Sequence, residues 1–418
     1  MKRIAKKEVK DNDAKMLTTV AIEKDREARI AMIQALIPLG LQAVGQALER
    51  EVSELAGPRY GREGEAYRWG SNAGSVYVGD QKLHIRVPRV RKTSGNEEIP
   101  LKSYQGLRDS GIIDDIALRR VIHGLSSQNY RGAAIAIPET FGIARNSVSR
   151  RWIRASSKKL RELQERSLEE QDIVSIILDG KSFGDNEMII GLGVTIAGEK
   201  VILGMIESST ENFTVCRDFL NSLVSRGLSI DKEYLVVIDG GKGLRKAVGA
   251  VFGKKAFVQR CQWHKRENVA SYVPKEKQSE WRRKLQAAYE LPGYEKAKKR
   301  LKSLRSELEQ LNISAARSLD EGFEETLTLH RLGVFEQLGI SFKTTNLIEN
   351  VNSGLERRTG RVTRWHTSDQ RQRWVAAALL EIEPRFRKLK GYKYLPMLRM
   401  AMKSFVSGNE DTLLNQAA

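Results

Sequence analysis

The chain has 418 residues, and its 71 Lys and Arg against 52 Asp and Glu give a net charge of +19. This length accommodates two or three domains, and a hydrophobic content of 40% with 9 Pro indicates a folded chain with a sizeable core. The positive charge, spread along the chain, favours a polyanionic partner, nucleic acid before an anionic membrane. The sequence contains no apolar run of 18 or more residues and no apolar segment after its basic start, which argues against membrane insertion and secretion. Two cysteines, Cys216 and Cys261, make no disulfide framework and fit a reducing cytosol.

The N-terminal part is predicted to be mainly helical. Residues 1–20 are polar and basic and are expected to be flexible, whereas apolar residues recur every three or four positions in 21–55, which is typical of a helix. Pro38 should divide or kink that helix. A β-hairpin is predicted around Gly79-Asp80, with strand residues that alternate on either side. Its second strand ends in the basic stretch 88–92, which either follows a phosphate backbone or is a solvated strand end.

Residues 130–156 have the outline of a helix-turn-helix. A first helix at 130–141, a turn at Gly142 and a second helix at 146–156 are predicted, although Pro138 inside the first helix opposes the match. A plain helical hairpin is the alternative. We expect the second helix to present arginines to the major groove of DNA beside its apolar anchors. The arginines are Arg150, Arg151 and Arg154, and the anchors are Val148, Trp152 and Ile153. Residues 21–165 are therefore interpreted as a DNA-binding region, and the charged stretch 160–171 as the domain boundary.

Two short apolar runs further along each end in Asp-Gly. IVSIILD ends at Asp179 and LVVID ends at Asp239, and both are typical of strands buried inside a sheet. If the two strands are parallel neighbours, roughly 4.8 Å apart, both carboxylates leave the same edge of the sheet. They can then reach one divalent cation or a pair about 3.5–4 Å apart. The alternative is that each Asp-Gly only opens a turn.

The order of the elements around these runs predicts the fold class. Three antiparallel strands, a helix, a strand, a helix and a strand make an α/β ribonuclease-H-like domain, in which the first strand is central and the fourth lies parallel beside it. This catalytic domain is predicted at 170–275 and 340–384, with a helical insertion at 276–339 and a basic C-terminal tail at 385–418. A mainly helical region with a small β-hairpin precedes it.

Glu349 is the third acidic candidate. It lies in a helix predicted at 342–360 but away from the apolar stripe of that helix, so packing does not explain it. The alternative interpretation is a capping box, because Asn346 and Glu349 have its spacing.

The remaining motifs are interpreted as structural and not as metal-binding or nucleotide-binding sites. Cys261 and His264 have half the spacing of a zinc site, but the remaining Cys and His residues are not paired at ligand spacings. We expect the two residues to pack and hydrogen-bond at the start of a helix beside the acids. Trp263 between them should be buried, and stacking on an unpaired base is the alternative. Gly180-Lys181-Ser182 does not complete a nucleotide-binding loop because Ser175 stands where Gly is required, so no nucleotide cofactor is expected.

Four motifs together resemble the Mutator-type transposases of bacterial and archaeal insertion sequences. They are ILDGK at Asp179, VIDGGKGL at Asp239, QRCQWHKREN at Cys261 and His264, and TTNLIENVNSGLERRTGRV at Glu349. The resemblance implies a DDE transposase in which Asp179, Asp239 and Glu349 are both the catalytic residues and the metal ligands. Cys261 and His264 fall on the Cys-x-x-His signature of that family, whereas Trp263 departs from the small or aliphatic residue expected before that His.

The resemblance also implies cofactors and partners. Two Mg²⁺ ions, replaceable by Mn²⁺, would activate the nucleophile and stabilise the leaving oxygen during strand cleavage and strand transfer. The expected partners are the terminal inverted repeats of the element and target DNA, bound by a homodimer or higher oligomer in the cytoplasm, associated with the nucleoid. Four arginines after Glu349 would hold the phosphate backbone: Arg357, Arg358, Arg361 and Arg364. Two other functions stay open, a hydrolytic nuclease or resolvase of the same fold and a helix-turn-helix regulator.

Overall fold

The computed structural model describes residues 26–60, 64–78, 81–95, 97–109, 111–133, 141–208 and 212–408. The chain forms two compact units, Met1–Ala155 and Ser156–Ala418. The basic segment predicted to be flexible, 1–20, lies outside the described residues. Within the described ranges, no helix has both the length and the apolarity needed to cross a membrane.

The first unit packs one long helix on a small sheet. Its elements are α2 (Arg26–Ala56), β1 (Ala66–Val78), β2 (Gln81–Lys92) and β3 (Glu98–Ile99). α2 is one helix, so Pro38 does not divide it, because a proline removes a single helical donor and the helix continues on both sides of it. A kink at Pro38, the other form of the prediction, stays a prediction. Leu48 and Val52 of α2 are buried against Val87 and Val90 of β2.

The predicted hairpin is confirmed. β1 and β2 pair antiparallel, with Val78 opposite Gln81, and β3 pairs with the end of β2. The basic residues at that end have acidic partners within the unit. Arg89 forms an ion pair with Glu98, and Lys92 Nζ lies 2.6 Å from Glu97 Oε2. A role of 88–92 along a phosphate backbone stays a prediction.

In the described part of the first unit, the sheet is followed by α3 (Lys102–Arg108), α4 (Gly111–Ile122) and α5 (Tyr130–Ala133), and α6 (Arg145–Glu165) begins there. α6 contains the predicted second helix and runs beyond it, past the boundary between the two units. Val148 and Trp152 are buried anchors, but the prediction is wrong for Ile153, which is 43% exposed. The predicted first helix is described only from Tyr130 to Ala133, and Pro138 lies outside the described residues.

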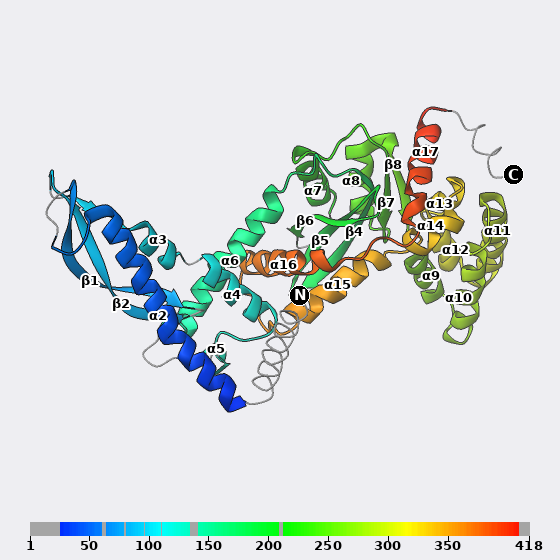
Figure 1. Ribbon diagram of the computed structural model, residues 1–418. Coiled ribbons are helices and arrows are strands. Elements are labelled where there is room, and N and C mark those ends of the chain that lie inside the picture. Colours follow the sequence, from blue (N-terminus) through cyan, green and yellow to red (C-terminus); the bar gives the residue numbers. More distant parts are fainter. Residues whose placement is uncertain are drawn as a thin grey trace, which may run out of the picture. The chain divides into compact units, whose positions relative to one another are not determined.

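The second unit is built on a five-stranded mixed sheet. Its strands are β4 (Ile173–Phe183), β5 (Asn186–Thr195), β6 (Lys200–Ser208), β7 (Tyr234–Ile238) and β8 (Ala256–Arg260). They lie in the order β6-β5-β4-β7-β8, in which β4, β5 and β6 are antiparallel and β7 and β8 run parallel to β4 (Figure 1). The prediction that the strand before Asp179 is central and the strand before Asp239 lies parallel beside it is therefore confirmed.

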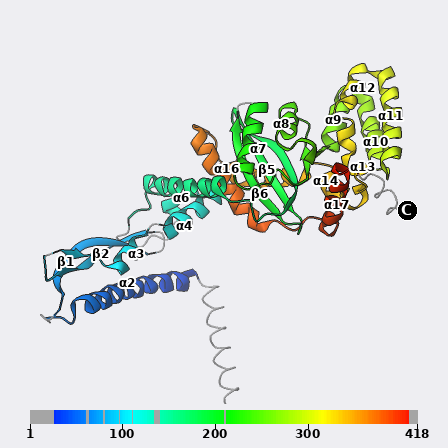
Figure 2. The same ribbon diagram turned by 90° about the horizontal axis from the view of Figure 1, so that it is seen from above.

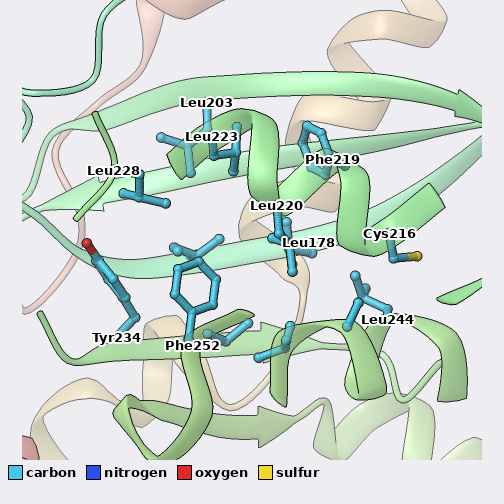
Figure 3. Packing of buried hydrophobic residues seen from close by; sticks show 14 of the residues in the cluster. Leu178, Leu203, Cys216, Phe219, Leu220, Leu223, Leu228, Tyr234, Leu244 and Phe252 are labelled. Atoms are coloured by element: carbon cyan, nitrogen blue, oxygen red, sulfur yellow. The ribbon is translucent and has the colours of Figure 1, made fainter. Parts of the chain in front are cut away.

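Helices α7 (Phe213–Ser225) and α8 (Lys242–Phe252) cover one face of this sheet. Figure 3 shows the apolar layer between them, where Leu178 of β4 and Leu203 of β6 meet Phe219 and Leu220 of α7 and Leu244 of α8. Side chains alternate along a strand, so the residues of β4 between these core positions face the other side. Burial on both faces explains why β4 and β7 read as continuous apolar runs.

A group of helices lies between β8 and α15 (Asn346–Thr359) in the chain, in the range where the helical insertion is predicted (Figure 2). It contains α10 (Lys275–Tyr289), α11 (Tyr294–Leu311), α12 (Ile313–Asp320), η2 (Glu324–Leu327), α13 (Thr328–Arg331) and α14 (Phe335–Phe342), after α9 (Gln262–Ser271). Leu301, Leu304 and Leu308 form the apolar stripe of α11 and pack with Trp281 and Leu285 of α10. The insertion therefore has a core of its own.

The remaining elements return to the sheet. They are α15 (Asn346–Thr359), α16 (Ser368–Ile382), η3 (Glu383–Arg385), η4 (Tyr392–Tyr394) and α17 (Leu395–Val406). α15 contacts β4 and α16 contacts β6, on the side opposite α7 and α8 (Figure 1). The predicted helix 342–360 starts later, because α14 ends at Phe342 and α15 begins at Asn346. The basic tail contains a packed helix, since Leu398 of α17 is buried and Arg399 bonds Asp172 beside β4.

Candidate active site

The three predicted acids come from three elements that meet at one edge of the sheet. Asp179 lies in β4, Asp239 follows the last residue of β7, and Glu349 lies in the first turn of α15. β4 and β7 are parallel neighbours, so their carboxyl ends share an edge, and α15 contacts β4. Residues 60 and 170 positions apart in the sequence are thereby brought into one acidic cluster.

The Asp179 carboxyl group interacts electrostatically with the other two acids. Burial raises the pKa of Asp179 to about 7, and the charges of Asp239 and Glu349 act in the same direction, while the charge of His264 opposes them. Like charges close together disfavour the ionised form of each. The charges of Asp239 and Glu349 therefore reach Asp179, and His264 is the group that opposes them.

Each acid is held by a hydrogen bond. Asn352 Nδ2 donates to Asp179 Oδ2 at 2.9 Å, the Gly241 N–H donates to Asp239 Oδ1 at 3.1 Å, and the Thr345 hydroxyl donates to Glu349 Oε1 at 2.8 Å. The sequence reasoning missed Asn352 and Thr345. The signal for Asn352 was present, because a residue three positions after Glu349 lies on the same face of a helix. The Oδ1 atom of Asn352 is buried without a hydrogen-bond partner.

The capping-box interpretation of Glu349 is wrong. Asn346 is the first residue of α15 rather than its cap, and the N-cap residue is Thr345. The Glu349 carboxylate accepts its hydrogen bond from the Thr345 side chain and does not close a box with Asn346. Its position is explained by the acidic cluster and by Thr345.

The turn after Asp239 requires a glycine. Gly240 has φ +118°, and a Cβ there would lie 2.1 Å from Nε of Arg260. Arg260 is buried and donates from Nη1 to the carbonyl of Glu321 in the insertion. Asp239-Gly240 therefore does form a turn, as the alternative interpretation states. The same turn also places the Asp239 carboxylate beside the other two acids.

Cys261 and His264 pack beside the acids at the start of α9, as predicted. Cys261 is fully buried and caps the helix, with Sγ accepting the His264 N–H at 3.5 Å. The Thr345 hydroxyl lies 3.6 Å from that sulfur and 3.4 Å from His264 Nδ1, so one residue links the motif to Glu349. The hydrogen bond to Cys261 raises the pKa of His264 to about 8 against the effect of burial, and the charges of Asp239 and Glu349 add to the rise.

Trp263 differs from its prediction. The prediction that it is buried is wrong, because its side chain is 46% exposed. Gln262 and Lys265, on either side of the Trp263-His264 pair, fill the buried face of α9, with exposed fractions of 5% and 0%. The indole contacts His264 edge to face, with ring centroids 4.8 Å apart.

In the described ranges, no group of three or more His, Cys, Asp or Glu side chains is arranged to hold a metal ion. The three acids are close enough to shift a pKa, yet each points an oxygen at a donor of the chain: Asn352, Gly241 or Thr345.

The predicted DNA-contacting arginines of the first unit have different environments. Arg150 is exposed on α6. Arg151 is 3% exposed, and its guanidinium lies over the Tyr77 ring at 5.4 Å. Arg154 donates two 2.8 Å hydrogen bonds to Asp114 of α4. Two of these three side chains therefore have structural partners within the unit.

In the second unit, Arg357 and Arg358 lie in the last turn of α15, and Arg361 and Arg364 follow that helix. Arg357, Arg361 and Arg364 are exposed, whereas Arg358 is half-buried and donates from Nη1 to the Gly354 carbonyl at 3.1 Å.

The fold and the site thus define a mixed α/β protein with an acidic cluster where its parallel strands end. Comparison with known families then identifies the chain. The family described as "Transposase, Mutator family" matches residues 12–388. The chain belongs to the Mutator family of transposases, enzymes that cleave DNA and transfer strands.

Individual relatives agree with this assignment. The chain is 27% identical to the transposase for insertion sequence element ISRM5 of Rhizobium meliloti, over 85% of this chain and 89% of the relative. It is 25% identical to the transposase for insertion sequence element IS406 of Burkholderia multivorans, over 87% and 96%. It is 26% identical to the transposase for insertion sequence element IS256 in transposon Tn4001 of Staphylococcus aureus, over 72% and 77%.

Proposed function

We propose that the second unit is a ribonuclease-H-like catalytic domain in which Asp179, Asp239 and Glu349 form a DDE triad. The triad would cleave DNA at the ends of an insertion sequence and join those ends to target DNA. One observation carries the proposal: three acids from β4, β7 and α15 share a cluster in which burial, and then the charges of Asp239 and Glu349, raise the pKa of Asp179. Structural acids are normally paired with bases, whereas an acid whose pKa is raised by burial and by neighbouring acids is typical of a functional site.

The cluster fits a divalent cation by its chemistry. All three side chains offer carboxylate oxygens, the donors preferred by Mg²⁺, and Mn²⁺ accepts the same donors. Their mutual repulsion is the quantity that a cation would relieve. When bound, such ions supply activation of a water or 3′-hydroxyl nucleophile and stabilisation of the leaving oxygen.

The chain's own residues would orient the reaction. Asn352 fixes one oxygen of Asp179, and the Gly241 N–H fixes one oxygen of Asp239. Thr345 holds Glu349 and lies within 3.4 Å of His264. With its pKa near 8, His264 is largely protonated at neutral pH and places a positive charge beside the acids. That charge would favour the approach of a phosphate to an otherwise anionic site.

DNA binding completes the proposal. The first unit would recognise the terminal inverted repeats through α6, with Arg150 as its exposed basic residue. Arg151, which is buried over Tyr77, would have to move to contact DNA, whereas the Arg154 side chain is 52% exposed in its pair with Asp114 and could contact a phosphate without leaving it. Exposed arginines at and after the end of α15 would hold the phosphate backbone near the acids. A homodimer or higher oligomer in the nucleoid would bring two element ends together.

Incubation of the purified full-length chain with DNA carrying the ends of its element tests this function. We expect nicking at the ends and, with target DNA present, joined products that disappear when EDTA removes the divalent cation. Nicking without joining would favour the hydrolytic nuclease or resolvase. End binding without any nicking, in Mg²⁺ and in Mn²⁺, would favour the regulator.

A further inference from the structure

Trp263 combines exposure with a rigid position. It is the second residue of α9, directly after the buried helix cap Cys261. The Gln262 N–H before it donates to the Lys343 carbonyl at 2.9 Å, which fixes the first turn of the helix. In that anchored turn the indole is 46% exposed. A large aromatic side chain held this way presents a ready-made flat surface to solvent.

The indole also lies at the acidic cluster. Its ring lies at 75° to the ring of His264, with 4.8 Å between the centroids. The indole is therefore in direct contact with a residue of the site. His264 in turn is within the field of Asp239 and Glu349. Tyr272, at the other end of α9, is similarly exposed at 50% but belongs to the C-cap of the helix, away from Cys261 and His264.

We propose that the exposed face of Trp263 stacks on an unpaired nucleobase of the DNA, next to the phosphate that is cut at the acidic cluster. Every base has a π-face, and stacking on an aromatic side chain does not depend on base identity. Unpairing a base costs free energy, and stacking on the indole would offset part of that cost. The inference rests on the proposed function, because it needs DNA at Asp179, Asp239 and Glu349.

A stacking surface that accepts any base would help to position the DNA strand that is cut. A phosphate is positioned by charge alone, whereas a stacked base also fixes the rotation of its nucleotide about the backbone. Holding the nucleotide beside the scissile phosphate would thus align that phosphate with the acids. Trp263 would contribute through binding of the strand being cut, and His264 would keep its ring in place.

The test compares full-length wild type with Trp263→Ala, Trp263→Phe and the matched control Tyr272→Ala. Each is given end DNA that is either intact or abasic at one of the nucleotides flanking the cut. On intact DNA, Trp263→Ala should cleave about tenfold more slowly, the size expected for one stacked base. Trp263→Phe should cleave within about threefold of the wild-type rate, and Tyr272→Ala should cleave at the wild-type rate. At one abasic position, wild type should slow to the rate of Trp263→Ala, and the two proteins should no longer differ.

The abasic arm separates stacking from an indirect effect through His264. If Trp263→Ala slows cleavage equally on intact DNA and on every abasic DNA, the side chain acts on the site and not on a base, and the proposal is overturned. Equal rates of Trp263→Ala and wild type on intact DNA would also overturn it. A wild type that cleaves none of these DNAs would instead refute the proposed function. Thermal denaturation of the variants checks that Trp263→Ala and Trp263→Phe are equally folded.

Discussion

Asn352 Nδ2 donates a 2.9 Å hydrogen bond to Asp179 Oδ2, joining α15 to the central strand at the acidic cluster. The other amide atom of Asn352, Oδ1, is buried without a partner. A buried acceptor left unpaired is costly, so the side chain is positioned at the expense of its own hydrogen bonding. The bond orients an acid whose pKa is raised to about 7 by burial and by its acidic neighbours.

We predict that Asn352→Ala slows strand cleavage by about 10- to 100-fold, the usual effect of removing a residue that orients a metal ligand. The loss should be smaller at high Mn²⁺ concentration, because the carboxylate remains and only its orientation is lost. The measurement is the cleavage rate as a function of metal concentration. Asn350→Ala is the matched control, since Asn350 is exposed on the same helix. Equal rates for the two variants would show that the bond to Asp179 has no part in the reaction.

Gly240→Ala should reduce cleavage by at least about 100-fold, because a small displacement of a reacting group has effects of this size. The new Cβ would meet the Arg260 guanidinium and move the Asp239 turn. Gly253→Ala is the control: its φ of +58° imposes comparable backbone strain, but nothing lies within 4 Å of the added Cβ. Both variants should be destabilised by about 1–3 kcal/mol, and only Gly240→Ala should lose cleavage. Normal cleavage by Gly240→Ala would mean that the turn tolerates displacement.

Local pattern was sufficient to predict much of the second unit. β4 and β7 are buried on both faces, so their residues are apolar throughout, and the terminal Asp residues stand out from the sequence alone. The apolar stripe of α11 was equally readable, because its period is that of a helix. From these strands the parallel pairing of β4 with β7, and hence the meeting of Asp179 and Asp239, followed by topology.

What the sequence could not predict depends on partners far along the chain. Arg151 and Arg154 have the composition of DNA-contacting residues, but Tyr77 and Asp114 engage them, and neither partner is marked by any local pattern. Trp263 was predicted to be buried because tryptophan is a large, mostly apolar residue. Its exposure depends instead on which face of α9 packs against the insertion. Asn352 became visible only when α15 was placed against β4.

Asp172 should make stability depend on pH. Hydrogen bonding from Arg399, helped by Lys232 and opposed by burial, lowers the pKa of Asp172 to about 2. Its pKa in the unfolded chain is about 3.9, so the pair stabilises the fold above pH 4, and this contribution is lost as the pH falls from about 4 to about 2.

The variant Asp172→Asn should therefore lower Tm by about 2–4 °C at pH 7, and the difference from wild type should shrink as the pH approaches 3. The small size follows from the 42% exposure of the Asp172 side chain. Asp231→Asn, which removes a carboxylate that is 88% exposed, should change Tm by less than about 1 °C. A Tm difference for Asp172→Asn that is constant from pH 7 to pH 3 would contradict a role for its charge.

Arg150→Ala should weaken binding of end DNA and reduce the salt dependence of that binding by about one phosphate contact, with Tm unchanged. Arg154→Ala should instead lower stability. It breaks the pair with Asp114 and lowers the Tm of the first unit. Binding isotherms of the full chain at several salt concentrations, together with thermal denaturation, separate the two. An unchanged affinity and salt slope for Arg150→Ala would place end recognition elsewhere.

The repulsion of Asp179 by Asp239 and Glu349 predicts an unusual effect on stability. Without divalent cations, Asp179→Asn and Asp239→Asn should keep or raise Tm, because a neutral amide removes repulsion within the cluster while preserving shape. Thermal denaturation in EDTA measures this. A fall of several degrees would mean that the carboxylates hold the fold together as ordinary structural ligands of the chain.

The central claim is that Glu349, with Asp179 and Asp239, carries out the phosphoryl transfer. The most direct measurement is strand joining by Glu349→Gln, using DNA whose 3′-hydroxyl end is already exposed, so that only the transfer step is required. Gln keeps the hydrogen bond from Thr345 and loses only the anionic oxygen. Glu356→Gln is the control, because Glu356 lies on the same helix, is 62% exposed and pairs with Lys181 at 2.9 Å. We predict no detectable joining by Glu349→Gln, normal end binding by it, and near-normal joining by Glu356→Gln. Joining by Glu349→Gln at the wild-type rate would contradict the claim, and Asp185 or Glu187 would then be the next candidates for the third acid.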